Sequence, residues 1–202
     1  VRLVGSEMCI RDSLKIQCSI LGKQDIVVGD SVNLEYQNKN DPRSALITSR
    51  IERASELKKK SIRGSKVIAA NITHVGILLV QNPTTSTEFI DKWIASSKAS
   101  NIEPFIINNK IDIDMPSAYL EKIEIYKNID IEIFNISAKE NTGLIDLTDY
   151  LQNKCTIFVG NSGAGKSTLT SKLTGVDIKT IALSNTQGRH TTSLSSLYMI
   201  PE

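Results

Sequence analysis

A glycine-rich segment near the carboxyl end constrains the fold more than any other feature of the sequence. Residues 160–167 read Gly-Asn-Ser-Gly-Ala-Gly-Lys-Ser and fit the phosphate-binding pattern G-x-x-x-x-G-K-[ST]. An apolar segment, residues 156–159, precedes it as an expected strand, and Leu169 and Leu173 behind it share one face of an expected helix. Because the motif needs this strand and helix, a chance glycine turn explains the segment less well than a phosphate-binding loop.

The chemistry of such a loop follows from its backbone. Glycines let successive N–H groups wrap a phosphate, and the amino end of the following helix favours the negative charge. We expect Lys166 to reach the β- and γ-phosphates and Ser167 to ligate Mg²⁺. The predicted nucleotide-binding residues of this region are Gly160, Asn161, Ser162, Gly163, Ala164, Gly165, Lys166, Ser167 and Thr168.

Two further motifs follow expected strands and predict which base is bound. Asn109-Lys110-Ile111-Asp112 comes after the apolar residues 105–107, at the end of a strand where open α/β sheets bind ligands. The Asp112 carboxylate can accept hydrogen bonds from the ring N–H and the exocyclic amine of guanine together, a donor pair that adenine lacks. Alone this tetrapeptide would be read as a polar turn, but beside a phosphate-binding loop it favours guanine.

The segment Ser137-Ala138-Lys139 follows the next expected strand, residues 131–136. It resembles the third guanine-site element of GTPases, in which a backbone N–H at the position of Ala138 meets the guanine oxygen. Its value comes from its place one strand after the Asp112 motif. The predicted base-site residues are Asn109, Lys110, Asp112, Ser137, Ala138 and Lys139.

The base motifs precede the phosphate loop, which is the reverse of the usual order in GTPases. From residue 67 onward, expected strands alternate with amphipathic helices, the first of which is predicted to open on a Thr85/Glu88 capping box. A short connection at residues 153–155 can join the helix expected after Ser137-Ala138-Lys139 to the strand that precedes the phosphate loop. We therefore predict the α/β class, with a circularly permuted P-loop GTPase domain built on a mainly parallel, doubly wound sheet.

The amino-terminal part is expected to be different. Residues 14–55 show short β-type runs punctuated by turn residues and predict a small barrel, and residues 56–66 read as a basic linker. Residues 43–66 hold eight basic and two acidic side chains, a balance of +6, which fits either a phosphate-attracting patch or a solvated linker. Residues 1–13 lack periodicity and look like a non-native, adapter-derived tail, so we expect them outside the fold.

A polar stretch after the phosphate loop carries candidate catalytic residues. A threonine such as Thr191 or Thr192 can ligate Mg²⁺ or sense the γ-phosphate, and His190 can orient or deprotonate water. An ordinary exposed loop histidine is the alternative for His190.

The sequence has the Asp112 motif first, then Ser137-Ala138-Lys139, then the phosphate loop, then the stretch with His190. With its motifs in this order, the sequence resembles, over residues 16–202, the family of circularly permuted, ribosome small subunit-dependent GTPases. The resemblance implies an amino-terminal OB-fold that binds ribosomal RNA and GTP hydrolysis, with Mg²⁺, stimulated by the small subunit in its late maturation. It also implies that His190 takes part in hydrolysis, with Thr191 and Thr192 in the first switch. Two alternatives stay open: an ATP-using P-loop enzyme, and a nucleotide- and RNA-binding module without useful turnover.

The sequence departs from that family at both ends. The family continues into an Asp-x-x-Gly switch and a zinc domain, so we expect Zn²⁺ only in a full-length form and a GTPase domain, residues 67–202, that is incomplete and hydrolyses slowly. The family's barrel also begins with strands before Ile16, so a partial OB-fold is expected. Because the sequence has no apolar run of about 20 residues and no export signal, we expect a cytoplasmic protein that does not bind a membrane. We also expect it to be a monomer that binds GTP and GDP.

Overall fold

The computed structural model describes residues 2–5, 8–11, 14–22, 24–36, 44–61, 64–176 and 197–201. Its described residues up to Ile72 belong to one compact unit, the barrel unit, and those from Thr73 to Val176 to another, the sheet unit. The boundary therefore falls later than the domain boundary expected at residue 67. None of the described helices is long and apolar enough to cross a membrane.

The barrel unit contains a five-stranded sheet that closes on itself. Its strands are β1 (Arg2–Gly5), β2 (Met8–Arg11), β3 (Leu14–Ile20), β4 (Val32–Tyr36) and β5 (Ser44–Arg50), in the order β1-β2-β3-β5-β4. The β3–β5 pair is parallel and the other pairs are antiparallel. A bridge between Arg2 and Ser31 joins the first strand to the start of β4 and closes the ring, which gives an OB-type barrel where a partial one was expected.

The expectation that residues 1–13 lie outside the fold is wrong for this structure. Residues 2–11 supply β1 and β2, and β2 pairs with β3 from Met8 opposite Gln17 to Arg11 opposite Leu14. Two strands of four residues are too short to display the alternation by which strands are recognised in a sequence.

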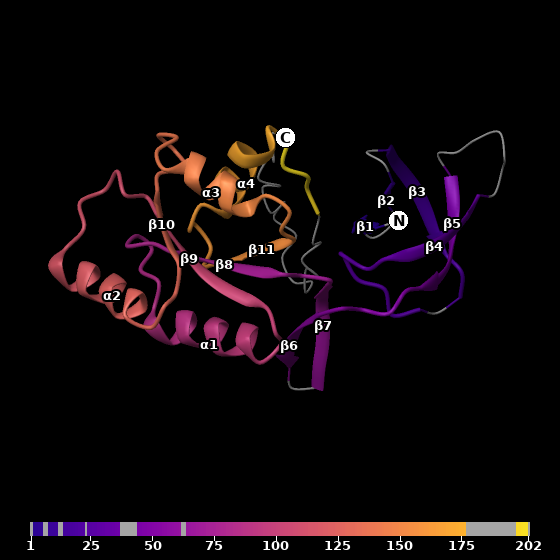
Figure 1. Cartoon of the computed structure of the whole chain (residues 1–202), viewed down its shortest axis with the longest axis horizontal. Coiled ribbons are helices and arrows are strands. Elements are labelled where there is room, and N and C mark those ends of the chain that lie inside the picture. The colour runs from indigo at the N-terminus through magenta and orange to yellow at the C-terminus, as the bar shows by residue number, and fades with distance from the viewer. Residues whose placement is uncertain are drawn as a thin grey trace, which may run out of the picture. The chain divides into compact units, whose positions relative to one another are not determined.

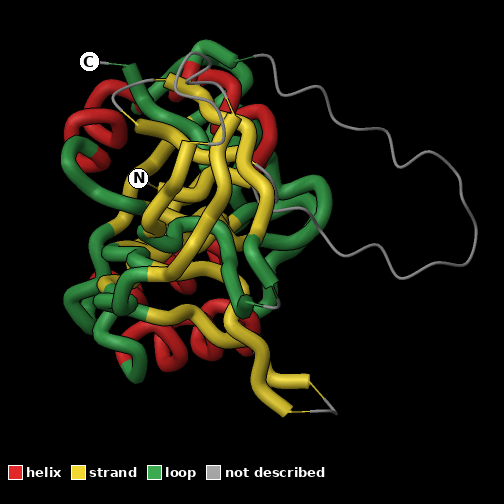
Figure 2. Tube along the Cα trace, turned by 90° about the vertical axis from the view of Figure 1, so that its right-hand side faces the viewer, coloured by secondary structure: helices red, strands yellow, loops and turns green. Residues whose placement is uncertain are grey.

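The expected basic linker is also a hairpin rather than an irregular segment. Strands β6 (Glu56–Ser61) and β7 (Gly64–Ala70) pair in antiparallel fashion and run side by side in Figure 2. Lysine is depleted in strands, so the lysines at positions 58–60 concealed this element from a propensity argument.

A buried ion pair joins the hairpin to the barrel. The Arg53 guanidinium donates from Nε to Asp30 Oδ1 at 2.7 Å and from Nη2 to Asp30 Oδ2 at 2.8 Å, and both side chains are almost fully buried. Its Nη1 also donates to Glu56 Oε1 at 2.9 Å, and this bond, with a second from Lys58, lowers the pKa of Glu56 to about 2. Losing one member of a buried pair is destabilising by about 3–5 kcal/mol, so Arg53 stabilises the contact between Asp30 and the first residue of β6, Glu56.

The sheet unit is built on four parallel strands, as predicted. They are β8 (His74–Leu79), β9 (Glu103–Asn109), β10 (Ile133–Ile136) and β11 (Thr156–Val159), in the order β10-β9-β8-β11. Figure 1 shows helices α1 (Thr87–Lys98) and α2 (Ser117–Lys127) on one face of the sheet and α3 (Leu144–Leu151) and α4 (Lys166–Thr174) on the other. This is the doubly wound arrangement.

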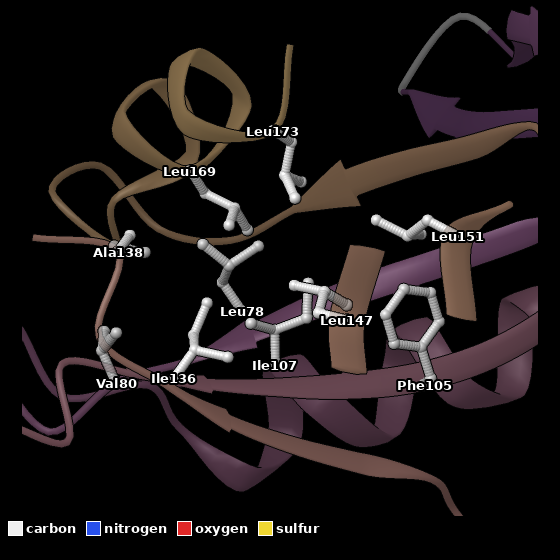
Figure 3. Close-up of a cluster of buried hydrophobic side chains, with 11 residues drawn as sticks. Leu78, Val80, Phe105, Ile107, Ile136, Ala138, Leu147, Leu151, Leu169 and Leu173 are labelled. Atoms are coloured by element: carbon white, nitrogen blue, oxygen red, sulfur yellow. The ribbon is translucent and has the colours of Figure 1, made fainter. Parts of the chain in front are cut away.

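The core beneath α3 and α4 is continuous and apolar (Figure 3). Leu169 and Leu173 of α4 lie over Leu78 of β8, and Leu147 of α3 belongs to the same buried cluster. Gly76, in the middle of β8, has no side chain because a Cβ there would lie 2.8 Å from the rings of both Phe105 and Phe158. The phosphate-loop helix is therefore held on the sheet by the leucines that the sequence placed on its inner face.

The first helix begins one residue later than its predicted capping box implies. Ser86 is the N-cap of α1 and accepts a hydrogen bond from the N–H of Phe89 at 3.3 Å. Thr85 is fully buried and its Oγ1 accepts instead from the N–H of Val80 at 3.1 Å, while Glu88 pairs with Lys92 at 2.6 Å. The capping-box prediction is wrong because the Thr85 hydroxyl accepts its hydrogen bond from Val80, in the loop after β8, and not from the first turn of α1.

Candidate functional site

The polar motifs of the sequence gather at the carboxyl edge of the four-stranded sheet. Asn109 is the last residue of β9 and pairs in register with Ile136, the last residue of β10, while the phosphate loop leaves β11. Because all four strands are parallel, the loops after them emerge at the same edge, which is where such sheets bind ligands.

The phosphate loop has the backbone that its glycines permit. Gly163 and Gly165 have φ values of +78° and +93°, and Gly165 is the N-cap of α4. The Lys166 ammonium donates to the carbonyl oxygens of Gly160 at 2.7 Å and of Asn161 at 2.9 Å, and burial lowers its pKa. A positive charge is thus held over a loop whose helix end attracts anions.

One buried amide connects the phosphate loop to a base-site loop. Asn109 is only 3% exposed, and its Nδ2 donates to the carbonyl of Ala164 at 3.0 Å. Its Oδ1 accepts from the backbone N–H of Ala138 at 3.1 Å. By resemblance to GTPases this N–H was expected to meet a guanine oxygen, but here it already has an acceptor, so a base oxygen would have to share it.

The Asp112 carboxylate is held in place by the other base-site loop. The buried Ser137 donates from its Oγ to Asp112 Oδ1 at 2.6 Å, and this bond is the main cause of a lowered pKa at Asp112. The N–H of Glu140 in turn donates to Ser137 Oγ at 3.1 Å. The carboxylate is therefore ionised at neutral pH and exposed, as an acceptor for two donors of a base must be.

Lys110 is bonded to the loop after β8, which no sequence motif predicts as part of the site. Lys110 has a φ of +69°, and its Nζ donates to the carbonyl of Asn82 at 2.6 Å. Next to Asn82, Pro83 lies against the phosphate loop, 3.4 Å from where a Cβ on Gly163 would stand. Only the position of this loop in the sequence could have indicated its role, since residues 81–84 follow β8, the neighbour of the phosphate-loop strand.

The remaining predicted residues divide into two groups. Ser162 and Thr168 are exposed, Ser167 is partly buried in the first turn of α4, and Lys139 pairs on the surface with Glu140 at 2.8 Å. His190, Thr191 and Thr192 lie outside the described residues. Among the residues that are described, no group of three or more His, Cys, Asp or Glu side chains could hold a metal ion.

Comparison with known sequences gives one consistent result. A family model described as RsgA GTPase matches residues 50–202. The small ribosomal subunit biogenesis GTPases RsgA of Flavobacterium psychrophilum and Flavobacterium johnsoniae are 32% and 33% identical to this chain over 91% of its length. The chain spans 62% of the length of each of these relatives.

Solved structures agree with the fold. YjeQ from Thermotoga maritima superposes with a TM-score of 0.67 at 26% identity, covering 85% of this chain and 63% of that one. YloQ, described as a circularly permuted GTPase, gives a TM-score of 0.63 at 23% identity over 86% of this chain and 63% of its own. These structural matches confirm the circularly permuted fold that the order of the motifs predicted.

The contact between Gly165 and Asn109 yields a test of the phosphate loop. An added Cβ on Gly165 would lie 2.4 Å from Asn109 Nδ2, at a φ that side chains rarely adopt. Gly165→Ala should therefore strain the loop by about 1–3 kcal/mol and break the bond to Ala164. We expect affinity for a fluorescent GTP analogue to fall at least about tenfold, measured by titration.

Gly175→Ala is the matched control. Gly175 ends α4 with a φ of +67°, but a Cβ there would meet nothing within 4 Å. This variant should unfold at a lower temperature and keep its nucleotide Kd within about twofold. Equal losses of affinity in both variants would show that general strain, and not the Asn109 contact, controls binding.

Proposed function

We propose that this chain, which belongs to the RsgA GTPase family, binds GTP and GDP at the carboxyl edge of its sheet. We further propose that its protein hydrolyses GTP to GDP and phosphate and acts, as a cytoplasmic monomer, in late maturation of the small ribosomal subunit. Curated relatives are named as small ribosomal subunit biogenesis GTPases, which supports the biological role. The observation that carries the proposal is the Asn109 amide, whose two hydrogen bonds join it to Ala164 in the glycine-rich loop and to Ala138 in the loop after β10.

The held carboxylate of Asp112 favours guanine over adenine. Guanine presents a ring N–H and an amine to such a group, whereas adenine presents an unprotonated ring nitrogen beside its amine, which a carboxylate repels. The hydrogen bond from Ser137 orients the Asp112 carboxylate and lowers its pKa, which supports this preference. An ATP-using enzyme has no use for this arrangement.

The oxygen chemistry at the start of α4 suits Mg²⁺. This ion prefers a few protein oxygens together with phosphate oxygens, and the Ser167 hydroxyl at the helix end supplies one. Thr191 would supply a second and His190 would orient the attacking water, with Thr192 in the same switch. Bound Mg²⁺ would neutralise charge on the β- and γ-phosphates, and Lys166 would donate to their oxygens.

The basic hairpin of the barrel unit is the proposed contact with ribosomal RNA. Lys58 and Lys66 are both exposed, and Lys66 is paired in backbone register with Lys59. OB-type barrels bind oligonucleotides, and lysines presented on strands attract phosphates without reading sequence. The patch interpretation is therefore preferred to the solvated linker.

The base assignment predicts a change of specificity in Asp112→Asn. Loss of a charged acceptor should weaken guanine-nucleotide binding by roughly 10- to 100-fold. Xanthine nucleotides should bind better than before, since their edge offers an acceptor where guanine has its amine. Competition against a labelled GTP analogue measures both effects, and equal competition by ATP against the unaltered protein would sink the guanine assignment.

Turnover has its own measurement. Phosphate release from GTP by a full-length form should rise when small ribosomal subunits are added, and Lys166→Ala should abolish it because the phosphates lose their cation. His190→Ala should slow release by about 10²- to 10⁴-fold if the histidine acts on water. Tight GTP binding with no release in the presence of subunits would favour the nucleotide- and RNA-binding module without turnover.

The RNA contact is tested by reversing charge on the hairpin. Lys58→Glu combined with Lys66→Glu should weaken binding to small-subunit ribosomal RNA, because fewer counterions are released from its phosphates. The slope of log affinity against log salt should become shallower by about 1 to 2, measured by fluorescence anisotropy over a salt series. The Kd for GDP should stay unchanged.

Lys92→Glu combined with Lys98→Glu makes the same change in net charge on α1. Both lysines are exposed in the sheet unit, away in sequence from the hairpin. This control should keep the wild-type salt slope. If hairpin and control variants lose RNA affinity equally, overall charge explains the binding and the hairpin is only a solvated segment.

A further inference from the structure

Asn108 occupies a buried position in β9, where an apolar side chain is the rule. Parallel strands covered on both faces are normally apolar throughout, and β9 follows this rule from Phe105 to Ile107. Asn108 is only 1% exposed, and its partner in register on β10 is Asn135. A buried amide is unfavourable unless its hydrogen bonds are made, so its partners show what it holds.

Every polar atom of the Asn108 amide has a partner. Its Nδ2 donates to Asn135 Oδ1 at 2.8 Å and approaches Met115 Sδ at 3.8 Å. Its Oδ1 accepts from the hydroxyl of Tyr119 at 2.7 Å. Burial raises the pKa of Tyr119, so the hydroxyl remains a donor throughout the physiological range.

These residues stand at the ends of both base-site loops. Asn108 comes directly before Asn109, and Tyr119 lies in the first turn of α2, beyond the loop that carries Asp112. Asn135 comes two residues before Ser137, which holds the Asp112 carboxylate. The network therefore joins the start and the end of one loop to the strand that carries the other.

We propose that Asn108, Asn135 and Tyr119 are positioning residues for guanine recognition, which set the distance between the loop of Asp112 and that of Ser137. The inference rests on the proposed binding of guanine nucleotides. A carboxylate that receives a hydrogen bond at 2.6 Å from Ser137 must be placed to within a fraction of an ångström. Apolar contacts lack direction, whereas a fully satisfied polar network has one geometry.

The ratio of the Kd for IDP to the Kd for GDP measures how well Asp112 is placed. IDP lacks the exocyclic amine and so makes one fewer hydrogen bond to the carboxylate. Tyr119→Phe leaves Asn108 Oδ1 without its donor and releases α2 from the end of β9. The ratio should fall about three- to tenfold in this variant, measured by calorimetric or fluorescence titration on the full chain.

Tyr126→Phe is the matched control on the same helix. Tyr126 is also buried, and its hydroxyl donates to Asp91 Oδ1 of α1 at 2.9 Å, away from the base-site loops. Thermal unfolding should show destabilisation of the same order in both tyrosine variants. The IDP-to-GDP ratio should stay at the wild-type value in Tyr126→Phe, which separates positioning from mere structural support.

The outcomes are distinguishable. A Tyr119→Phe protein with the wild-type ratio, or an equal fall in both tyrosine variants, overturns the inference while leaving guanine binding intact. A wild-type protein that binds IDP and GDP equally overturns the guanine assignment and the inference with it. If Tyr119→Phe does not fold, Asn135→Ala takes its place, because Asn135 lies on an edge strand and is exposed.

Discussion

The two hydrogen bonds of the Asn109 amide are the constraint on which the candidate site depends. They join Asn109 to Ala164, 55 residues away along the chain, and to Ala138, 29 residues away. Inside a protein, where the local dielectric is low, such bonds are stronger than in water and an unpaired partner is costly. The relative placement of phosphate loop and base loop is therefore decided in space, at the end of β9, and does not depend on the order in which the chain visits them.

This independence explains how a permuted chain keeps the site. The sheet holds β11 against β8 by a parallel ladder, and where the two strands begin the N–H of Thr73 donates to the carbonyl of Cys155 at 2.8 Å and the N–H of Cys155 to Thr73 Oγ1 at 2.9 Å. Only the short turn after α3 has to lead into β11. Since the ladder and the apolar core fix the strands, moving the chain's entry point leaves the carboxyl edge unchanged.

Local patterns predicted the parts of this structure that depend on short segments. The phosphate loop, the parallel apolar strands and the inner leucines of α4 were all readable, because each is specified within a few consecutive residues. Strand β2 and the hairpin strand β6 were not readable, since one is very short and the other is rich in lysine, so their pairing partners decide their conformation. The same holds for Asn82 and the hydroxyl of Tyr119, whose contacts with Lys110 and Asn108 come from distant or non-periodic positions.

In both units, apolar contacts hold the layers together and polar contacts orient the loops. Burial of leucine, isoleucine and phenylalanine fixes strands and helices as layers, but it is non-directional and leaves the orientation of loops open. Where a loop or hairpin must keep its place, each unit buries a polar group and satisfies it with hydrogen bonds: Asp30 with Arg53 in the barrel unit, and Asn108 with Tyr119 in the sheet unit. Such groups contribute less to stability than apolar ones of the same size, and one unpaired member is costly. Their directional bonds select one arrangement of the loops, which a site that reads the edge of a base requires.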